Sequence, residues 1–188
     1  MTAMIYILLG SVITLTAVWL YAKFYGFQAQ TPGDYEDENP AFDIRQHLNG
    51  PILCEGVIYG PLGRVSSRFV ADFEAQWDGD TGIMKETFTY DDGSIQNREW
   101  HLTILDNGQI CARAPDVVGE GEGRQSGSSV LLRYKIRLPE DSGGHVLDTV
   151  DWMYLTPDGT IMNRSQFRKF GIRVAELVAS IRPVEVAQ

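Results

Sequence analysis

Several polar side chains share a strand face with aromatic residues in this sequence, and this combination could bind a small molecule. Arg98 is in phase with Trp100 on one alternating segment, and Asp148 is in phase with Trp152 on another. If such faces line the inside of a β-barrel, the interior holds a cation, a carboxylate and an amide among aromatic rings, which is typical of a site for an amphiphile with a polar head. The predicted interior binding residues are Phe73, Arg98, Trp100, Asp148, Trp152, Tyr154 and Asn163.

The same polar residues also have a purely structural interpretation. Because a buried charge needs a partner, Arg98 and Asp148 could instead belong to an ion pair or a hydrogen-bonded network that closes one end of the barrel. A general acid–base role for Asp148 has no second group of known geometry to support it. The sequence therefore leaves enzymatic activity open, with a non-catalytic protein preferred and no catalytic residue assigned.

Other reactive side chains lack the spacing that a metal or cofactor site needs. The histidines are scattered, without a His-x-His or His-Glu-x-x-His pattern, and they are His47, His101 and His145. The Asp-Gly clusters at 78–80 and 91–93 match turns better than a calcium loop, which also needs a glutamate at its twelfth position. The glycines at 119–123 alternate with carboxylates that would repel phosphate. We predict no metal and no cofactor.

Charge and cysteine content narrow the class of protein further. The chain has 188 residues, with 25 acidic and 16 basic side chains and a net charge of -9. Such a chain binds nucleic acid poorly, because phosphate contacts need clustered Lys and Arg. Cys54 and Cys111 lie on separate predicted strands, and two cysteines are too few for a disulfide-stapled scaffold. The sequence does not decide whether these cysteines form a disulfide bridge or remain two independent thiols.

Alternation of apolar and polar residues with a period of two dominates the chain after its first quarter. It is clearest at 65–78, and the other alternating segments are 53–59, 83–90, 95–105, 109–114, 129–138, 146–156, 160–169 and 174–182. Asp-Gly and Asn-Gly turns connect many of them. Because so many antiparallel strands must pair their edges, we predict an all-β, up-and-down, lipocalin-like barrel of nine or ten strands, with a two-sheet β-sandwich as the alternative. The glycine-rich residues 115–127 fit either a mobile loop or a bent, bulged strand.

The N-terminal residues predict a membrane anchor. Residues 3–22 are uncharged and, at about 1.5 Å per residue, long enough as a helix to span the hydrocarbon core of a bilayer. A cleaved signal peptide is the alternative, although a basic n-region and an Ala-x-Ala site are missing. We predict a transmembrane anchor with interfacial aromatics at 1–27, an acidic tether at 28–39 and a barrel domain at 40–188. The barrel domain begins with a short helix at 40–48 that Asn39 caps.

Several short strings occur in the order found in a known bacterial family. They are Phe42-Asp43-Ile44-Arg45, Asn49-Gly50-Pro51, Trp77-Asp78-Gly79-Asp80-Thr81-Gly82, Tyr90-Asp91-Asp92-Gly93, Asp116-Val117-Val118-Gly119, Asp151-Trp152-Met153-Tyr154, Asn163-Arg164-Ser165 and Lys169-Phe170-Gly171. Through them the chain resembles, over residues 40–182, a family of bacterial envelope proteins catalogued as domain of unknown function 3833. The resemblance implies no assigned activity and no catalytic residues. Its members usually begin with a lipoprotein signal, whereas this chain carries an uncharged helix.

The resemblance also implies a location and a lipid-related role. Because lipoprotein relatives face the envelope space, we expect a single-pass protein of the bacterial inner membrane with a periplasmic C-terminal domain. The leading prediction is a membrane-tethered barrel that binds an apolar or amphiphilic small molecule, such as a lipid or fatty-acid derivative. The alternatives are a structural or protein-interaction module of the envelope with a filled barrel, and a small lipid-modifying or isomerising enzyme that uses Arg98 and Asp148.

Overall fold

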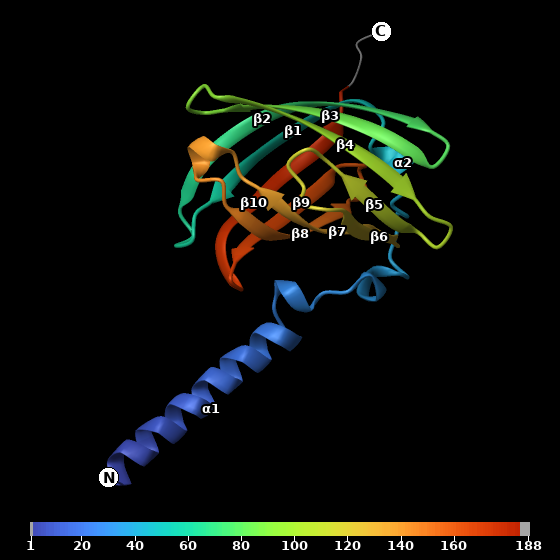
Figure 1. The fold of residues 1–188 in the computed structure, drawn as a ribbon. Coiled ribbons are helices and arrows are strands. Elements are labelled where there is room, and N and C mark those ends of the chain that lie inside the picture. The colour runs from blue at the N-terminus through green and yellow to red at the C-terminus, as the bar shows by residue number, and fades with distance from the viewer. Residues whose placement is uncertain (1, 185–188) are drawn as a thin grey trace.

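The chain forms a closed antiparallel barrel that follows an N-terminal helix (Figure 1). The computed structural model describes residues 2–184. The strands are β1 (Gly50–Tyr59), β2 (Val65–Asp78), β3 (Thr81–Tyr90), β4 (Ile95–Ile104), β5 (Gln109–Arg113), β6 (Gly121–Ser126), β7 (Ser129–Arg137), β8 (Val146–Leu155), β9 (Ile161–Lys169) and β10 (Ile172–Pro183). Each strand pairs with the next in sequence, and β1 pairs with β10 to close the barrel. The predicted up-and-down, lipocalin-like barrel is confirmed, and the sandwich alternative is wrong.

The alternating pattern places one face of each strand inside the barrel. On β2, the buried residues Phe69, Ala71, Phe73 and Ala75 alternate with exposed neighbours, which are polar except for Val70. Asp-Gly turns join the strands where the sequence predicts them, and Gly79 at the β2–β3 turn has a positive φ of 58°. Glycine adopts this conformation without the steric cost that a side chain would bring.

The region 115–127 contains one further strand, β6, which the alternation pattern left undecided. Its inward positions are Gly121, Gly123 and the polar Gln125 rather than apolar side chains, so the usual signal is missing. A Cβ on Gly123 would lie 2.3 Å from the carbonyl oxygen of Leu131, and one on Gly121 would lie 3.0 Å from Cβ of Tyr134. These glycines allow β7 to pack closely against β6, and residues 114–120 form the loop before it.

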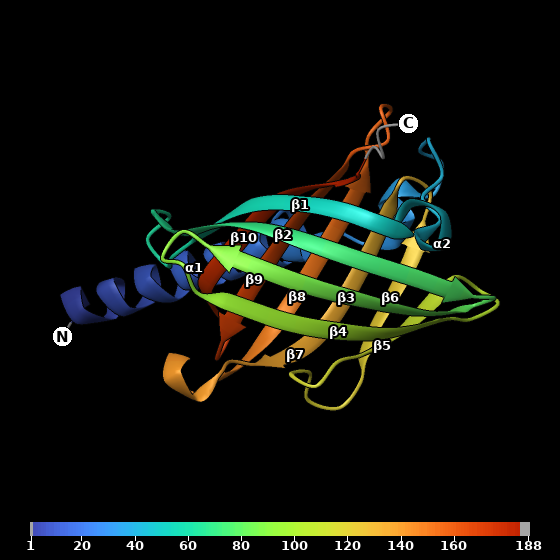
Figure 2. The same ribbon diagram turned by 90° about the horizontal axis from the view of Figure 1, so that it is seen from above.

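A short helix, α2 (Ile44–His47), closes one end of the barrel (Figure 2). Ile44 and Leu48 are almost fully buried, and Nε1 of Trp77 donates a hydrogen bond of 2.7 Å to the carbonyl oxygen of Leu48. The helix was predicted at 40–48 with Asn39 as its cap, and both bounds and cap are wrong. Asp43 caps the helix instead, because its side chain accepts a hydrogen bond from the backbone N–H of Arg45.

The N-terminal helix α1 (Thr2–Phe24) extends away from the barrel, and its apolar side chains are exposed (Figure 1). Its 20-residue stretch Thr2–Tyr21 is long and apolar enough to cross a membrane, and a signal sequence near an N-terminus has the same character. Between α1 and α2, two 3-10 turns follow, η1 (Phe27–Ala29) and η2 (Pro32–Tyr35).

The segment 27–35, which overlaps the acidic tether predicted at 28–39, lies against the outer wall of the barrel. The ring of Tyr35 packs against Trp152 and Tyr154 at centroid distances of 5.4 and 5.5 Å. Gln30 accepts a hydrogen bond of 2.6 Å from the Tyr154 hydroxyl. The chain passes so close to the β6–β7 turn that a Cβ on Gly127 would lie 1.7 Å from the carbonyl oxygen of Tyr35.

Candidate functional site

The interior of the barrel contains a cavity of about 680 Å³. This volume lies within the range of roughly 300–1,000 Å³ that is typical of small-molecule sites. The apolar part of its lining includes Phe73, Phe88, Trp100, Leu132, Met153 and Leu177. Ile44 and Leu48 from α2 line the closed end. Residues next to the hairpin loops, such as Ser66, Asp92 and Pro139, line the opposite end, which we call the mouth.

A buried arginine forms the first polar group of the cavity. Arg98 on β4 lies opposite Glu86 on β3, and its Nη1 is 3.4 Å from Oε2 of Glu86. Its Nε donates a hydrogen bond of 2.7 Å to Oδ2 of Asp116, from the loop that follows β5. The guanidinium also lies 4.8 Å from the ring centroid of Trp100. The positive charge is therefore held by two carboxylates and one aromatic face.

A buried aspartate forms the second polar group. Oδ1 of Asp151 on β8 accepts hydrogen bonds from the Asn163 amide at 2.5 Å and from the Ser165 hydroxyl at 2.8 Å. Both donors lie on the neighbouring strand β9. The Tyr134 hydroxyl on β7 is 3.5 Å from the other oxygen, Oδ2. Asp151 thus has donors from two neighbouring strands, as a buried carboxylate requires.

The two polar groups meet across the lumen. The rings of Trp100 and Tyr134 pack edge to face at a centroid distance of 5.2 Å, which joins the Arg98 side of the cavity to the Asp151 side. We call this set the polar belt, and its members are Glu86, Arg98, Asp116, Tyr134, Asp151, Asn163 and Ser165. A belt of donors and acceptors inside an otherwise apolar lumen can hold the polar part of an amphiphile while the walls hold its apolar part.

Burial changes the acidity of the belt. Removal of water raises the pKa of Glu86 to about 7, although the charge of Arg98 acts in the opposite direction. Burial also raises the pKa of Asp151, against the hydrogen bonds from Ser165 and Asn163, and raises the pKa of Tyr134 well above its ordinary value. Near neutral pH, the Glu86 carboxyl can therefore either donate or accept a hydrogen bond.

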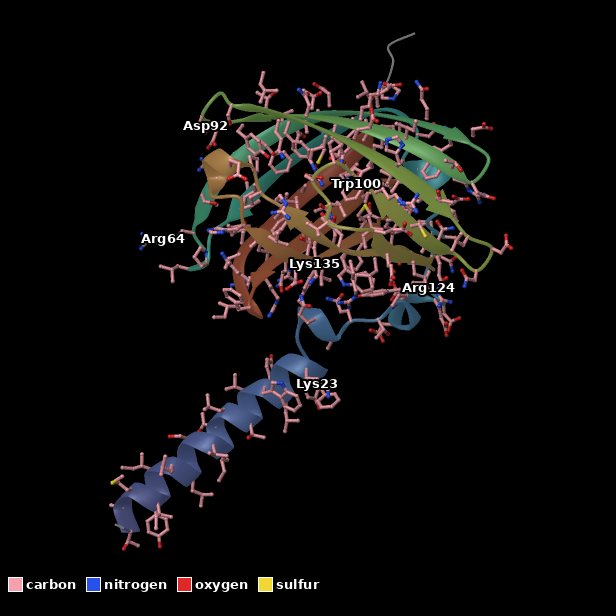
Figure 3. All side chains as sticks on the ribbon, in the orientation of Figure 1. Lys23, Arg64, Asp92, Trp100, Arg124 and Lys135 are labelled. Atoms are coloured by element: carbon pink, nitrogen blue, oxygen red, sulfur yellow. The ribbon has the colours of Figure 1, made fainter. Side chains whose placement is uncertain are left out.

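Four of the seven predicted interior residues line the cavity. Phe73, Arg98, Trp100 and Asn163 come from β2, β4 and β9 and face the lumen, as the phase of their strands predicted. Figure 3 shows Trp100 among the strands of the barrel. Their role in ligand binding stays a prediction.

The other three residues lie on the outer wall, so their predicted placement in the lumen is wrong. Asp148 is exposed, and its carboxylate lies 3.7 Å from Nζ of Lys135. Trp152 is fully buried, but beneath Tyr35 of the segment 27–35 rather than inside the barrel, and Tyr154 lies beside it. Both faces of β8 are apolar because both are covered, so aromatic character did not identify the inner face.

The sequence contained a signal for some of the missed belt residues. Glu86 is in phase with the inward-facing Met84 and Phe88 on β3, so the period of that strand already placed a carboxylate inside. Asp151 alternates with the aromatic residues of β8, and correct assignment of that strand would have exchanged Asp148 for Asp151. Nothing in the local sequence identified Asp116, which a loop carries to Arg98.

Neither cysteine takes part in a disulfide. Cys54 on β1 lines the lumen, and burial raises the pKa of its thiol. Cys111 on β5 is half-buried. Among residues 2–184, no three His, Cys, Asp or Glu side chains are grouped so that they could hold a metal ion.

Comparison with known proteins identifies a family and a fold. Residues 21–183 match the family described as "Protein of unknown function (DUF3833)". None of the curated proteins matches the chain. An S-type phycobiliprotein lyase from Guillardia theta is similar in structure, with a TM-score of 0.56 and 7% sequence identity over 77% of this chain and 92% of that one. The protein Rv2717c from M. tuberculosis gives a TM-score of 0.55 and 14% identity over 79% of this chain and 100% of that one. At these identities the likeness concerns the fold.

Proposed function

The chain belongs to the DUF3833 family, and we propose that it is a membrane-anchored barrel that binds one amphiphilic small molecule, such as a lipid or fatty-acid derivative, inside its lumen. The observation that carries this proposal is the cavity of about 680 Å³, which combines apolar walls with the polar belt. The apolar chain of the ligand lies along Phe73, Phe88 and Leu132, and its polar head contacts the belt. The likeness to a phycobiliprotein lyase supports the proposal only through the shared barrel fold.

The cavity also argues against a barrel that serves only as an interaction module. A filled barrel would have no interior space, whereas a cavity of about 680 Å³ stays open between the inward side chains of this one. The enzyme that was considered from the sequence needs Arg98 and Asp148 together. These residues lie on opposite faces of the barrel wall, so that pair carries no reaction.

The anchor is part of the proposal. Helix α1 spans the bacterial inner membrane and the barrel lies on its periplasmic side, as the resemblance to envelope lipoproteins implies. The length and apolar composition of Thr2–Tyr21 support the membrane span. Lys23 lies over the ring of Trp19, at 4.9 Å from its centroid, an arrangement suited to the headgroup layer at the end of the helix.

Photocrosslinking tests where a lipid binds. The full chain in phospholipid nanodiscs would be incubated with a fatty acid that carries a diazirine in its chain, illuminated, and digested for peptide mass spectrometry. We expect crosslinks on lumen-facing residues of β4, β7 and β9 in addition to any on α1. Crosslinks confined to α1 and the outer wall would contradict the proposal.

A pair of tryptophan substitutions provides the control. Ala175 lines the cavity near its mouth, so Ala175→Trp should fill part of the lumen and reduce lumen crosslinks several-fold. Val70 lies on the outer face of β2 and is 47% exposed, so Val70→Trp adds the same ring without entering the lumen. Equal loss in both variants would show that the signal does not report lumen binding.

A further inference from the structure

Two neighbouring hairpins at the mouth of the barrel expose large apolar side chains. Leu62 lies between β1 and β2 and is 89% exposed, and Phe170 lies between β9 and β10 and is also 89% exposed. Ile172, which begins β10, is 70% exposed. The two hairpins are adjacent because β1 pairs with β10. Exposed apolar side chains gathered at one place usually mark an interaction surface.

The same two hairpins are basic, although the chain as a whole carries a net charge of -9. Residues 60–68 and 168–175 contain no Asp or Glu, and their cations are Arg64, Arg68, Arg168, Lys169 and Arg173. The other hairpins of the mouth are acidic, with Asp91 and Asp92 between β3 and β4 and Glu140 between β7 and β8. The mouth is therefore polarised into an apolar, basic side and an acidic side. We call the first side the basic rim, and it consists of Leu62, Arg64, Lys169, Phe170 and Ile172.

The basic rim lies on the same side of the barrel as the N-terminal part of α1. In Figure 1 and Figure 2 the β1–β2 and β9–β10 hairpins point in the same general direction as the N-terminal part of α1. Figure 3 shows Arg64 on the lower side of the mouth, nearer to α1, and Asp92 on the upper side. A membrane that surrounds α1 therefore approaches the basic rim before it approaches the acidic hairpins.

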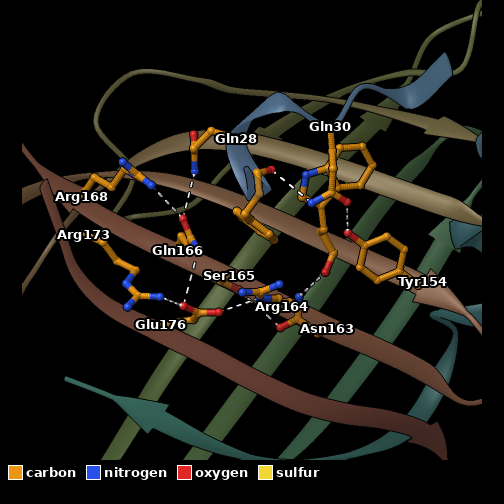
Figure 4. A network of polar contacts seen from close by, with 12 residues as sticks. Gln28, Gln30, Tyr154, Asn163, Arg164, Ser165, Gln166, Arg168, Arg173 and Glu176 are labelled. Carbon is orange, nitrogen blue, oxygen red and sulfur yellow. Dashed lines mark hydrogen bonds and ion pairs between the residues drawn. The ribbon is translucent and has the colours of Figure 1, made fainter. Parts of the chain in front are cut away.

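A network of polar contacts holds this geometry (Figure 4). Nε2 of Gln28, in the segment that follows α1, donates a hydrogen bond of 3.3 Å to Oε1 of Gln166 on β9. Gln166 in turn contacts Glu176 on β10, which also pairs with Arg173 at the base of the β9–β10 hairpin. The ring of Phe27 lies 4.7 Å from the guanidinium carbon of Arg164. The end of α1 and the basic rim are thus joined through neighbouring strands.

We propose that the basic rim inserts its apolar side chains into the headgroup layer of an anionic phospholipid bilayer, the same bilayer that holds α1, and so places the mouth of the cavity against the membrane surface. The cations face anionic headgroups, while Leu62, Phe170 and Ile172 enter the boundary with the acyl chains. This inference rests on the proposed membrane anchor and ligand. It adds the route: an amphiphile passes between bilayer and lumen at the mouth without crossing bulk water.

Spin-label accessibility tests the proposal on the full chain in nanodiscs. Cys111→Ser removes the half-buried thiol, and Cys54 stays because it is buried in the lumen. A nitroxide would then be placed at Phe170→Cys or, as a second position, at Ile172→Cys. Collisions with oxygen, which concentrates in the bilayer, would be compared with collisions with a water-soluble nickel chelate. We expect the oxygen-to-nickel ratio at both rim positions to exceed several-fold the ratio at Asp92→Cys on the acidic side.

A comparison of anionic and zwitterionic lipids tests whether the cations of the basic rim contribute to membrane contact. In nanodiscs that contain phosphatidylglycerol, Arg64→Gln together with Lys169→Gln should lower the oxygen-to-nickel ratio at position 170, whereas in phosphatidylcholine alone the same pair should change it little. Equal, water-like ratios at positions 170, 172 and 92 in both lipids would overturn the proposal. If those ratios were water-like while photocrosslinking still mapped to the lumen, the rim inference would fail and the proposed function would stand.

Discussion

At the scale of single residues, the polar belt determines what the lumen can bind. Two carboxylates that line the lumen, Glu86 and Asp151, lie near Arg98, and a third, Asp116, accepts a hydrogen bond from Arg98 in the loop that follows β5. If all three were ionised, their charges would outnumber that of Arg98 in surroundings of low dielectric constant, which is costly. The raised pKa values of Glu86 and Asp151 reduce this cost, because each carboxyl keeps its proton to higher pH. The belt therefore presents a mixture of donors and acceptors to the lumen.

The pH dependence of stability should report the ionisation of Glu86. Because its pKa rises from 4.5 in the unfolded chain to about 7 in the folded barrel, protonation favours the folded state. The contribution of Glu86 to the free energy of unfolding should fall as pH rises from below 4.5 through about 7. A shift of this size corresponds to about 3 kcal/mol between the two limits.

Glu86→Gln removes this ionisation and keeps the size of the side chain. Urea unfolding of the full chain in detergent, followed by tryptophan fluorescence, should show similar stability for the native protein and the variant at pH 4. At pH 8 the variant should be more stable by on the order of 2–3 kcal/mol. The charge of Asp151 also raises the pKa of Glu86, so the difference between the two proteins reports Glu86 together with its coupling to Asp151. A variant that is less stable than the native protein at pH 8 would show that Glu86 is ionised and stabilising.

At the scale of elements, much of the fold was predictable because period-two alternation and Asp-Gly turns are local signals. Phe69, Phe73 and Trp100 were placed inside by their strands alone. The signal failed where another part of the chain covers a strand. The segment 27–35 buries the outer face of β8, so Trp152 looked like an interior residue. It failed again at β6, where Gly121 and Gly123 replace the apolar side chains of an inner face.

The docking of segment 27–35 depends on Gly127, which has a positive φ of 51° and no room for a side chain beneath Tyr35. Gly127→Ala should displace the segment, since the new Cβ would overlap the backbone of Tyr35 and Glu36. Hydrogen–deuterium exchange should then show faster exchange of the backbone amides from residue 27 to residue 42. The barrel strands β2 to β4 should keep their protection.

Gly79→Ala is the matched control for this change. Gly79 has nearly the same φ, 58°, but a Cβ there meets no atom within 4 Å. Gly79→Ala should lower the free energy of unfolding only by the intrinsic penalty of the left-handed conformation, roughly 1 kcal/mol. It should leave hydrogen–deuterium exchange in segment 27–35 unchanged. If both variants left segment 27–35 protected from exchange, the close approach of Tyr35 to Gly127 would not be what holds this segment against the barrel.

At the scale of the whole molecule, three features are arranged along one path. Helix α2 closes the far end of the barrel, the polar belt lies inside it, and the mouth opens beside the basic rim on the side of α1 (Figure 2). This arrangement suits the proposed exchange of one amphiphile between the lumen and a membrane that surrounds α1. The sequence predicted an N-terminal helix long enough for an anchor and the barrel, but not the direction of the mouth, because that direction depends on how segment 27–35 lies on strands far away in sequence.

Native mass spectrometry of the full chain, purified from bacterial membranes and released from detergent in the gas phase, tests the central claim most directly. The account predicts one bound molecule of lipid-like mass per chain, retained by Val70→Trp and lost or strongly reduced in Ala175→Trp. Binding in the lumen would be contradicted if the native protein carried no bound molecule under conditions that keep the barrel folded. It would also be contradicted if Ala175→Trp left the bound molecule in place.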